Sequence, residues 1–145
     1  MIGLLQRVTE SRVRVEGETV AEIGLGLLVL VGVQKGDDEA KAARLLERLL
    51  GYRVFPDADG RMNRSLSDVS GELLLVPQFT LAADTRKGTR AGFSTAAPPA
   101  EGERLFSYLV ERSKAEYSRV ANGVFGADMR VELVNDGPVT FWLET

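Results

Sequence analysis

The first third of the chain alternates apolar and polar positions, which predicts β structure. Residues 4–15 show the period of two that is typical of a half-buried strand, and the Glu-Gly-Glu run at 16–18 supplies a turn before a second extended stretch at 20–23. Residues 27–33, with the sequence LLVLVGV, are apolar at every position. A strand with no polar face needs cover on both sides, so we expect this segment at the centre of the core.

The period changes to that of a helix in two places. Asp37 and Asp38 offer an N-cap to a helix that ends at Gly51, and a second helix is predicted near residues 100–117. Each has one apolar face at helical spacing, which we expect to be buried. These faces consist of Ala42, Leu45, Leu46, Leu49 and Leu50 in the first helix and Leu105, Phe106, Leu109 and Val110 in the second.

Between the helices the sequence predicts short strands at 52–55 and 72–76. The AspAlaAspGly run at 57–60 resembles the start of a calcium loop, but Arg61 stands where an oxygen ligand is needed, so we predict a tight hairpin turn. The order is therefore strands, helix, strands, helix, strands. It predicts an α/β fold in a single compact domain, residues 1–145, with mixed β-sheets layered with two main helices.

The run VELVNDGPVTFWL at 131–143 alternates like a strand, but Gly137 and Pro138 interrupt it. Proline cannot donate to a strand ladder and glycine weakens one. Both therefore occur mainly at edges, at bulges, or where a backbone comes close to another group. A simple bulge or turn explains the pair, and a segment of main chain presented to a ligand explains it as well.

Composition narrows the available chemistry. The sequence contains no histidine and no cysteine, which excludes the Ser-His-Asp triad, the Cys-His pair and zinc sites built on those residues. An enzyme with this composition has to use hydroxyls, carboxylates, amides, lysine, arginine and oriented backbone groups.

Charge and hydropathy limit the partners and the location. The net charge of -3 argues against a protein that tracks along a nucleic acid by broad electrostatics, although contact with one end of a nucleic acid stays open. No apolar run reaches the roughly 18 residues of a membrane span, and the N-terminus lacks the pattern of a signal peptide. We therefore expect a cytoplasmic protein that does not bind membranes.

An apolar strand runs directly into Pro77, Gln78, Phe79 and Thr80. The proline should end the ladder and leave backbone donors free to bind an anionic or carbonyl group. Gln78 can donate and accept hydrogen bonds, and Thr80 carries a hydroxyl. An ordinary structural turn explains the same residues.

Two further features have a functional and a structural interpretation. Arg86, Lys87 and Arg90 form the one dense basic cluster, which is suited to phosphates or is an ordinary solvated loop. Phe125 lies among small residues, which suits a ring exposed for stacking, although a core phenylalanine is the commoner arrangement.

Four blocks together resemble the D-aminoacyl-tRNA deacylase family, and the similarity runs the full length of the chain. Each block alone is weak, but the last two and their spacing are specific. The blocks are GlnArgVal at 6–8, GlnPheThrLeu at 78–81, GlyValPheGlyAlaAspMet at 123–129 and AsnAspGlyProValThr at 135–140.

The resemblance implies a homodimeric enzyme that acts without a metal or other cofactor, with a three-layer α/β/β fold. Such an enzyme hydrolyses the ester that joins a D-amino acid, or a glycine mischarged on tRNA-Ala, to the 3′ end of tRNA. In the family, a cis Gly-Pro pair, here Gly137 and Pro138, is presented by one subunit to the active site of the other. Arg7 corresponds to the arginine that holds this pair, Phe125 falls in the pocket for the terminal adenosine, and Met129 is also expected to bind substrate.

The resemblance also suggests a mechanism. If the carbonyls of Gly137 and Pro138 hold the substrate's α-amino group, an L-side chain collides with the backbone and a D-side chain does not. We expect the turn of Gln78, Phe79 and Thr80 to be catalytic, with backbone amides as the oxyanion site and the ribose 2′ hydroxyl helping to activate water. The rival mechanism uses Thr80 as a covalent nucleophile, although no general base is visible near it in the sequence.

Two other functions stay open on the sequence alone. One is a non-catalytic module that binds an RNA end or a nucleotide, and the other is a hydrolase of small D-amino-acid esters.

Pro77 departs from the family pattern, because bacterial members most often have serine there. In having a proline at this position, the chain is similar to a sister branch of the family that handles misacylated L-alanine.

Overall fold

Six strands form one mixed sheet in the computed structural model, which describes residues 1–145. The order is β2-β1-β3-β6-β7, and β8 pairs with the outer side of β1. Pairing is antiparallel around β1 and parallel from β3 to β6 to β7. The strands are β1 (Ile2–Val15), β2 (Glu18–Ile23), β3 (Gly26–Gly32), β6 (Glu72–Pro77), β7 (Val120–Asn122) and β8 (Arg130–Glu144).

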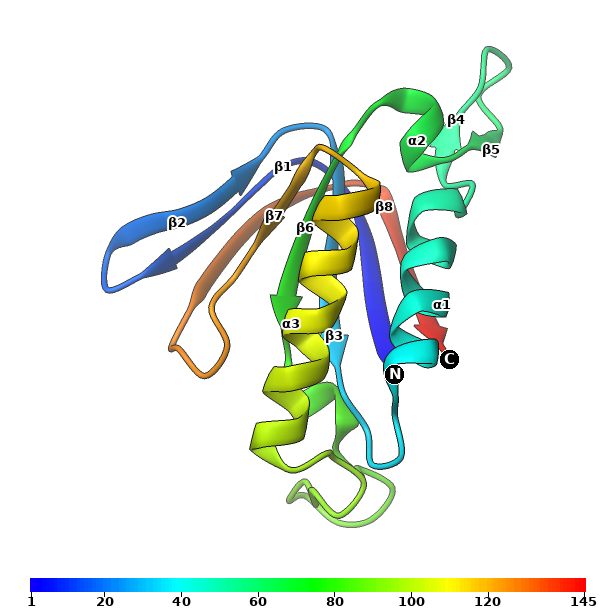
Figure 1. The fold of residues 1–145 in the computed structure, drawn as a ribbon. Coiled ribbons are helices and arrows are strands. Elements are labelled where there is room, and N and C mark those ends of the chain that lie inside the picture. Colours follow the sequence, from blue (N-terminus) through cyan, green and yellow to red (C-terminus); the bar gives the residue numbers. More distant parts are fainter.

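Two long helices cover one face of this sheet (Figure 1). They are α1 (Glu39–Gly51) and α3 (Pro99–Glu116), and they contact each other. Shorter elements complete the fold, namely β4 (Phe55–Pro56), β5 (Met62–Arg64), the one-turn helix α2 (Leu66–Val69) and the 3-10 turn η1 (Phe79–Ala82). The β4–β5 hairpin confirms the turn predicted at 57–60.

The other face of the central strands is covered by the bent outer part of the same sheet. β1 and β8 are long and bend, and β2 contacts both β6 and β7 (Figure 1). Apolar side chains fill the space on both sides of the central strands. The layers are thus helices, sheet and a second layer of strands, which confirms the α/β/β class.

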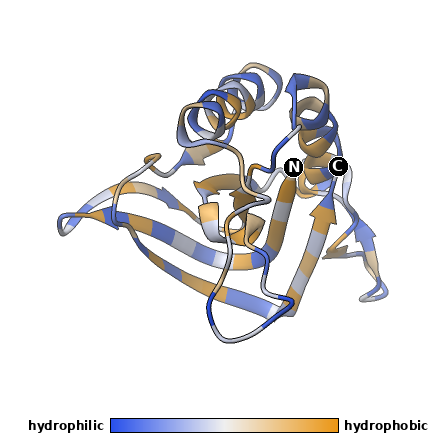
Figure 2. Cartoon of the chain, turned by 90° about the horizontal axis from the view of Figure 1, so that it is seen from below, coloured by the Kyte–Doolittle hydropathy of each residue, from blue (hydrophilic) through white to orange (hydrophobic).

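The uniformly apolar strand β3 explains why two layers of cover are needed. Leu27, Val29 and Val31 belong to the apolar cluster beneath the helices, and Leu28 belongs to a second cluster on the opposite face. Figure 2 shows the apolar and polar residues alternating along the long outer strands. Burying each leucine stabilises the fold by about 1.5–3 kcal/mol, so β3 favours the interior strongly.

The predicted helices are confirmed, but two details of the sequence interpretation are wrong. The Asp38 side chain caps α1 by accepting from the N–H of Lys41 at 2.9 Å. The strand predicted at 52–55 begins only at Phe55 and continues to Pro56, because the carbonyl of Val54 accepts a hydrogen bond from the Arg7 side chain instead of joining a ladder. Helix α2 was not predicted, although Ser65 and Asp68 form the reciprocal capping box that marks a helix start.

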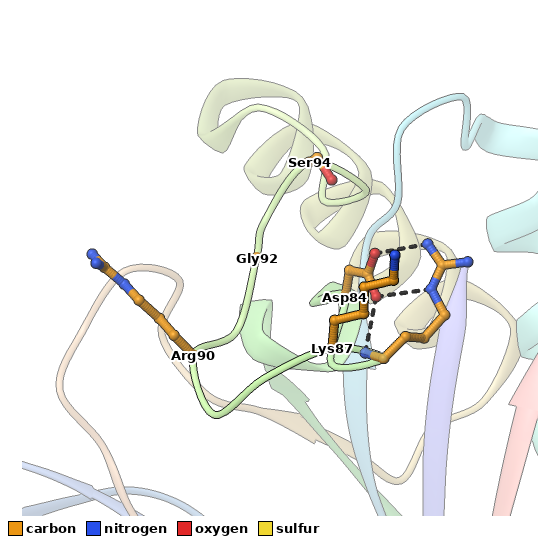
Figure 3. A pocket seen from close by; sticks show the side chains of 6 residues that line it. Asp84, Lys87, Arg90, Gly92 and Ser94 are labelled. Carbon is orange, nitrogen blue, oxygen red and sulfur yellow. Dashed lines mark hydrogen bonds and ion pairs between the residues drawn. The ribbon is translucent and has the colours of Figure 1, made fainter.

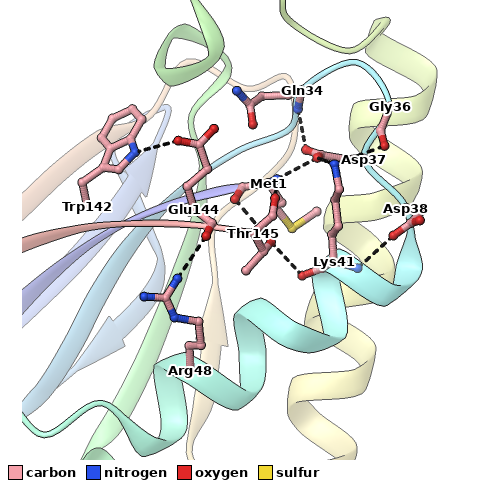
Figure 4. Close-up of polar contacts among 10 residues, drawn as sticks. All are labelled: Met1, Gln34, Gly36, Asp37, Asp38, Lys41, Arg48, Trp142, Glu144 and Thr145. Atoms are coloured by element: carbon pink, nitrogen blue, oxygen red, sulfur yellow. Dashed lines mark hydrogen bonds and ion pairs between the residues drawn. The ribbon is translucent and has the colours of Figure 1, made fainter.

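The two chain ends lie side by side and are joined by buried polar contacts (Figure 4). The amino group of Met1 donates to the carboxylate of Asp37 at 2.7 Å and to the carbonyl of Thr145 at 2.8 Å. Lys41 also reaches the Asp37 carboxylate at 3.2 Å. None of the helices is both long and apolar enough for a membrane span.

Candidate active site

The Gly-Pro pair lies in a wide bulge of β8. Gln6 pairs with Thr140 and Val8 pairs with Asn135, so residues 136–139 of β8 face the single residue Arg7 of β1. The extra residues cannot lie flat in the ladder and project from it. The bulge explains why the alternating pattern at 131–143 contains a glycine and a proline.

The base of the bulge is held by two side chains. Arg7 donates from Nε to the carbonyl of Asp136 at 2.9 Å and from Nη1 to the carbonyl of Val54 at 2.6 Å, and its side chain is only 12% exposed. Asn135 accepts from the N–H of Val139 at 2.7 Å and donates to the hydroxyl of Thr140 at 2.9 Å. These contacts tie both ends of the bulge to the body of the protein.

The tip of the bulge is exposed. Gly137 and Pro138 are joined by a cis peptide bond, and both residues face solvent in this chain. Gly137 has φ +143°, and a Cβ added there would lie 2.6 Å from Cγ2 and 3.0 Å from N of Val139. No residue other than glycine fits this position without moving the bulge.

A separate cavity of about 440 Å³ opens at the carboxyl end of β6. Its walls come from the end of β6, the first residue of α3, the β7–β8 loop and the start of β8. The lining residues are Val76, Pro77, Gln78, Phe79, Pro99, Phe125, Gly126, Ala127, Asp128, Met129 and Val131.

The turn after β6 brings polar main-chain groups to this cavity. The N–H of Gln78 donates to the carbonyl of Val31 at 2.7 Å, which anchors the turn to β3. Phe79 and Thr80 begin the 3-10 turn, where amides have no partner within the turn, and neither amide donates elsewhere in the chain. Two oriented N–H groups are therefore free for a ligand.

The Thr80 hydroxyl is exposed, and its one contact is the Gln78 amide, which donates to it at 2.6 Å. An amide that donates cannot remove a proton from the hydroxyl. No carboxylate or amine contacts Thr80, so nothing in the chain activates it as a nucleophile.

Phe125 is partly a core residue and partly a ring exposed for stacking, the two arrangements that the sequence allowed. One side of its ring packs on α3, where the ring centroid of Phe106 lies at 6.3 Å and Gly102 leaves room for it. The ring also lines the cavity together with Met129, whose sulfur accepts from the N–H of Val124 at 3.4 Å. Phe125 is thus half-buried, with an apolar surface left for a planar ligand.

The chain brings together only part of the expected site. Gln78, Phe79, Phe125 and Met129 share one cavity, and Thr80 adjoins it. Arg7, Gly137 and Pro138 lie together at the bulge but outside that cavity. Asn135 was not identified as a site residue, although its place at the start of the NDGPVT block is a usable signal.

The basic cluster borders another hollow of about 480 Å³, in the loop after η1 (Figure 3). Arg86 makes two side-chain hydrogen bonds to the Asp84 carboxylate, at 2.9 and 2.7 Å, and these bonds hold the pKa of Asp84 well below its usual range. Lys87 and Arg90 make no ion pair, and Figure 3 shows Arg90 extending away from Asp84. Arg86 is therefore neutralised within the loop, and the other two cations are available.

The fold and the cavity define an α/β protein with an aromatic-walled cavity beside free backbone amides, an arrangement that can stabilise the oxyanion formed in ester hydrolysis. No group of three or more acidic side chains is placed to hold a metal ion. The chain belongs to the D-Tyr-tRNA(Tyr) deacylase family, whose family model matches residues 4–144. It is therefore an enzyme of the hydrolase class.

Relatives and solved structures cover nearly the whole chain. The D-aminoacyl-tRNA deacylase of Thioalkalivibrio sulfidiphilus (strain HL-EbGR7) is 67% identical over 99% of this chain and 97% of its own length. A solved structure named c-Myc DNA Unwinding Element Binding Protein superposes with a TM-score of 0.95 at 36% identity, over 100% of this chain and 99% of that one. A probable eukaryotic D-amino acid tRNA deacylase shares the fold, with a TM-score of 0.83 at 17% identity over 99% and 98% of the two chains.

Proposed function

We propose that the protein hydrolyses the ester bond of D-aminoacyl-tRNA and releases the free D-amino acid and tRNA. The observation that carries this proposal is the pair of free amides at Phe79 and Thr80, beside a cavity with an aromatic wall. The cavity accepts the terminal adenosine against Phe125 and Met129. The amides then lie where the ester carbonyl can gain negative charge during attack by water.

The catalytic step uses main-chain and substrate groups. Two N–H donors stabilise the oxyanion, and the ribose 2′ hydroxyl of the substrate helps to activate the water. Gln78 keeps the turn in place through its bond to the Val31 carbonyl and orients the Thr80 hydroxyl. An activated ester needs less help than a peptide bond, so positioning and electrostatics suffice without a side-chain base.

Chiral selection is assigned to Gly137 and Pro138. Their carbonyls hold the substrate's α-amino group, so an L-side chain meets the rigid bulge and a D-side chain points away from it. Glycine has no side chain to collide, and glycyl-tRNA mischarged on tRNA-Ala is therefore also a substrate. Support comes from the way Arg7 and Asn135 fix the bulge while leaving its tip exposed.

The bulge acts in the cavity of a second copy, so the working enzyme is a homodimer. Gly137 and Pro138 are exposed and do not line the cavity of their own chain. Strand β8 pairs with β1 on one edge only, and its residues Val134 and Trp142 are 50% and 51% exposed. An open strand edge with exposed apolar side chains is suited to contact with another chain.

Lys87 and Arg90 contact phosphates of the bound tRNA. They are the unpaired cations of the basic loop, whereas Arg86 is neutralised by Asp84. With a net charge of -3 for the whole chain, this local attraction is limited to the few phosphates near the 3′ end.

The direct test measures amino acid released from D-tyrosyl-tRNA and L-tyrosyl-tRNA by purified protein in the presence of EDTA. We expect D-tyrosine to be released and L-tyrosine to be retained. Binding of tRNA without release would indicate a nucleic-acid-binding module instead, as the name of one structural relative suggests for that protein. Equal cleavage of free D-tyrosine esters and tRNA esters would indicate a small-molecule hydrolase.

A complementation assay tests the shared site. Gly137→Ala disables the bulge and Phe125→Ala disables the cavity, so neither variant alone has an intact site. If the bulge serves the other subunit, mixed dimers contain one intact site, and refolding an equal mixture restores about a quarter of wild-type activity. A bulge that served its own chain would give no recovery.

A further inference from the structure

Two exposed phenylalanine rings stack on each other at the edge of the cavity. The centroids of Phe79 and Phe93 are 4.8 Å apart and the rings are 23° from parallel. The two residues are 46% and 43% exposed, and neither belongs to an apolar cluster of the core. Exposed apolar side chains that adjoin one another mark places where a protein contacts a ligand or another macromolecule.

Phe93 lies where the apolar cavity meets the hollow of the basic loop. Its sequence neighbours Gly92 and Ser94 line the basic hollow (Figure 3), and Phe79, on which its ring stacks, lines the apolar cavity. A chain of nucleotides that leaves the cavity past Phe79 therefore meets Phe93 first, and then Lys87 and Arg90.

The backbone around Phe93 is anchored although its ring is exposed. Gly92 exchanges two hydrogen bonds with Asp84, at 2.8 and 2.9 Å. On the other side, the hydroxyl of Thr95 donates to the carbonyl of Ala82 at 2.5 Å, and the carbonyl of Thr95 accepts from the N–H of Lys35 at 3.0 Å. The ring is held at a fixed place, and a ligand that stacks on it loses little protein entropy.

We infer that the outer face of Phe93 binds the nucleobase that precedes the terminal adenosine in the unpaired 3′ end of the tRNA. This inference rests on the proposed function. Phe79 stacks on one face of the Phe93 ring, and Phe93 is still 43% exposed, so the other face is the one left for a ligand. Unpaired bases bind proteins by stacking on aromatic side chains, with neighbouring cations taking the phosphates. Phe93, Lys87 and Arg90 supply both parts of this arrangement.

The test compares two substrates that differ by the nucleotides before the terminal one. D-tyrosyl-tRNA contains them, and the 3′-D-tyrosyl ester of adenosine does not. For each variant the readout is the ratio of kcat/KM on the tRNA ester to kcat/KM on the adenosine ester. Any damage to the turn or to Phe79 affects both substrates, and it cancels in the ratio.

In Phe93→Ala we expect this ratio to fall about tenfold, the size of one lost base stack. Phe93→Leu keeps apolar volume but lacks a flat ring, so its ratio should fall as well, whereas Phe93→Tyr should keep the wild-type ratio. The leucine and tyrosine variants fill the space of the ring, and their comparison remains valid if the alanine variant does not fold.

An unchanged ratio in the leucine variant would overturn the inference, because it would limit Phe93 to supporting Phe79. A wild-type ratio for Phe93→Leu together with a lowered ratio for Phe93→Tyr would overturn it as well. Failure of the proposed function looks different, because wild-type protein would then release D-tyrosine from neither substrate, or from the tRNA ester and the adenosine ester equally well.

Discussion

A bulge interrupts strand β8 and a turn ends strand β6, but the chain treats the main-chain groups of these two segments in opposite ways. In the bulge, side chains take up these groups, since Arg7 bonds the Asp136 carbonyl and Asn135 bonds the N–H of Val139. In the turn, the amides of Phe79 and Thr80 have no partner.

This difference separates two tasks. A main chain whose base is tied by side chains keeps one shape and can exclude a ligand by collision. Free, oriented amides can stabilise charge that develops during a reaction. The bulge is thus suited to selection and the turn to chemistry. Side-chain changes should therefore have large effects at the bulge and small ones at the turn.

The largest effect is expected for Gly137→Ala. The new Cβ would lie 2.6 Å from Cγ2 of Val139, so the bulge has to move, and a displacement of about 1 Å at a reacting centre can cost roughly 100-fold in rate. We expect at least that loss of kcat/KM on D-tyrosyl-tRNA and a smaller difference between D- and L-substrates.

Gly17→Ala is the matched control for that change. Gly17 also has a positive φ, of +83°, but an added Cβ there has nothing within 4 Å. It should lose a little stability and keep full activity and selectivity. Wild-type kinetics in a folded Gly137→Ala variant would remove the bulge from the site.

A smaller effect is expected for Arg7→Met, which removes the hydrogen bonds to the carbonyls of Asp136 and Val54. Bonds from a charged donor contribute about 1.5–3 kcal/mol, so urea unfolding should show a loss of roughly 2 kcal/mol, and activity should fall about tenfold. Arg12→Met, on the same strand, removes only surface ion pairs. It should change stability by less than about 1 kcal/mol and leave activity intact.

Local patterns predicted the fold well and the site only in pieces. The apolar run of β3 and the Asp38 cap of α1 are local signals, and both were confirmed. The strand expected at 52–55 failed because Arg7, distant in sequence, takes the carbonyl of Val54. Gly137 and Pro138 were marked as an interruption, but their separation from the cavity follows from the strand register, which no local pattern contains.

A moderate effect is expected in the basic loop. Replacing Lys87 and Arg90 together by alanine should raise KM several-fold and reduce the slope of log KM against log salt by about 1.4, the value for two phosphate contacts on a single strand. Arg86→Ala should change the slope much less, because Asp84 already neutralises Arg86. The lowered pKa keeps Asp84 ionised at neutral pH and well into acid, so this pairing persists over the assay range. A slope change of about 0.7 for Arg86→Ala, the value for one phosphate contact, would mean that the Arg86 pair opens when tRNA binds.

The smallest effect is expected for Thr80→Val, although Thr80 lies nearest to the proposed chemistry. Valine keeps the shape and the backbone N–H and removes only the hydroxyl, whose one partner is the Gln78 amide. If the amides act on the oxyanion, single-turnover release of D-tyrosine should slow by less than about threefold. A covalent role for Thr80 instead requires a loss of about a thousand-fold or more. Such a loss would place the chemistry in the side chain and end the contrast between a turn that acts through its main chain and a bulge that selects by its shape.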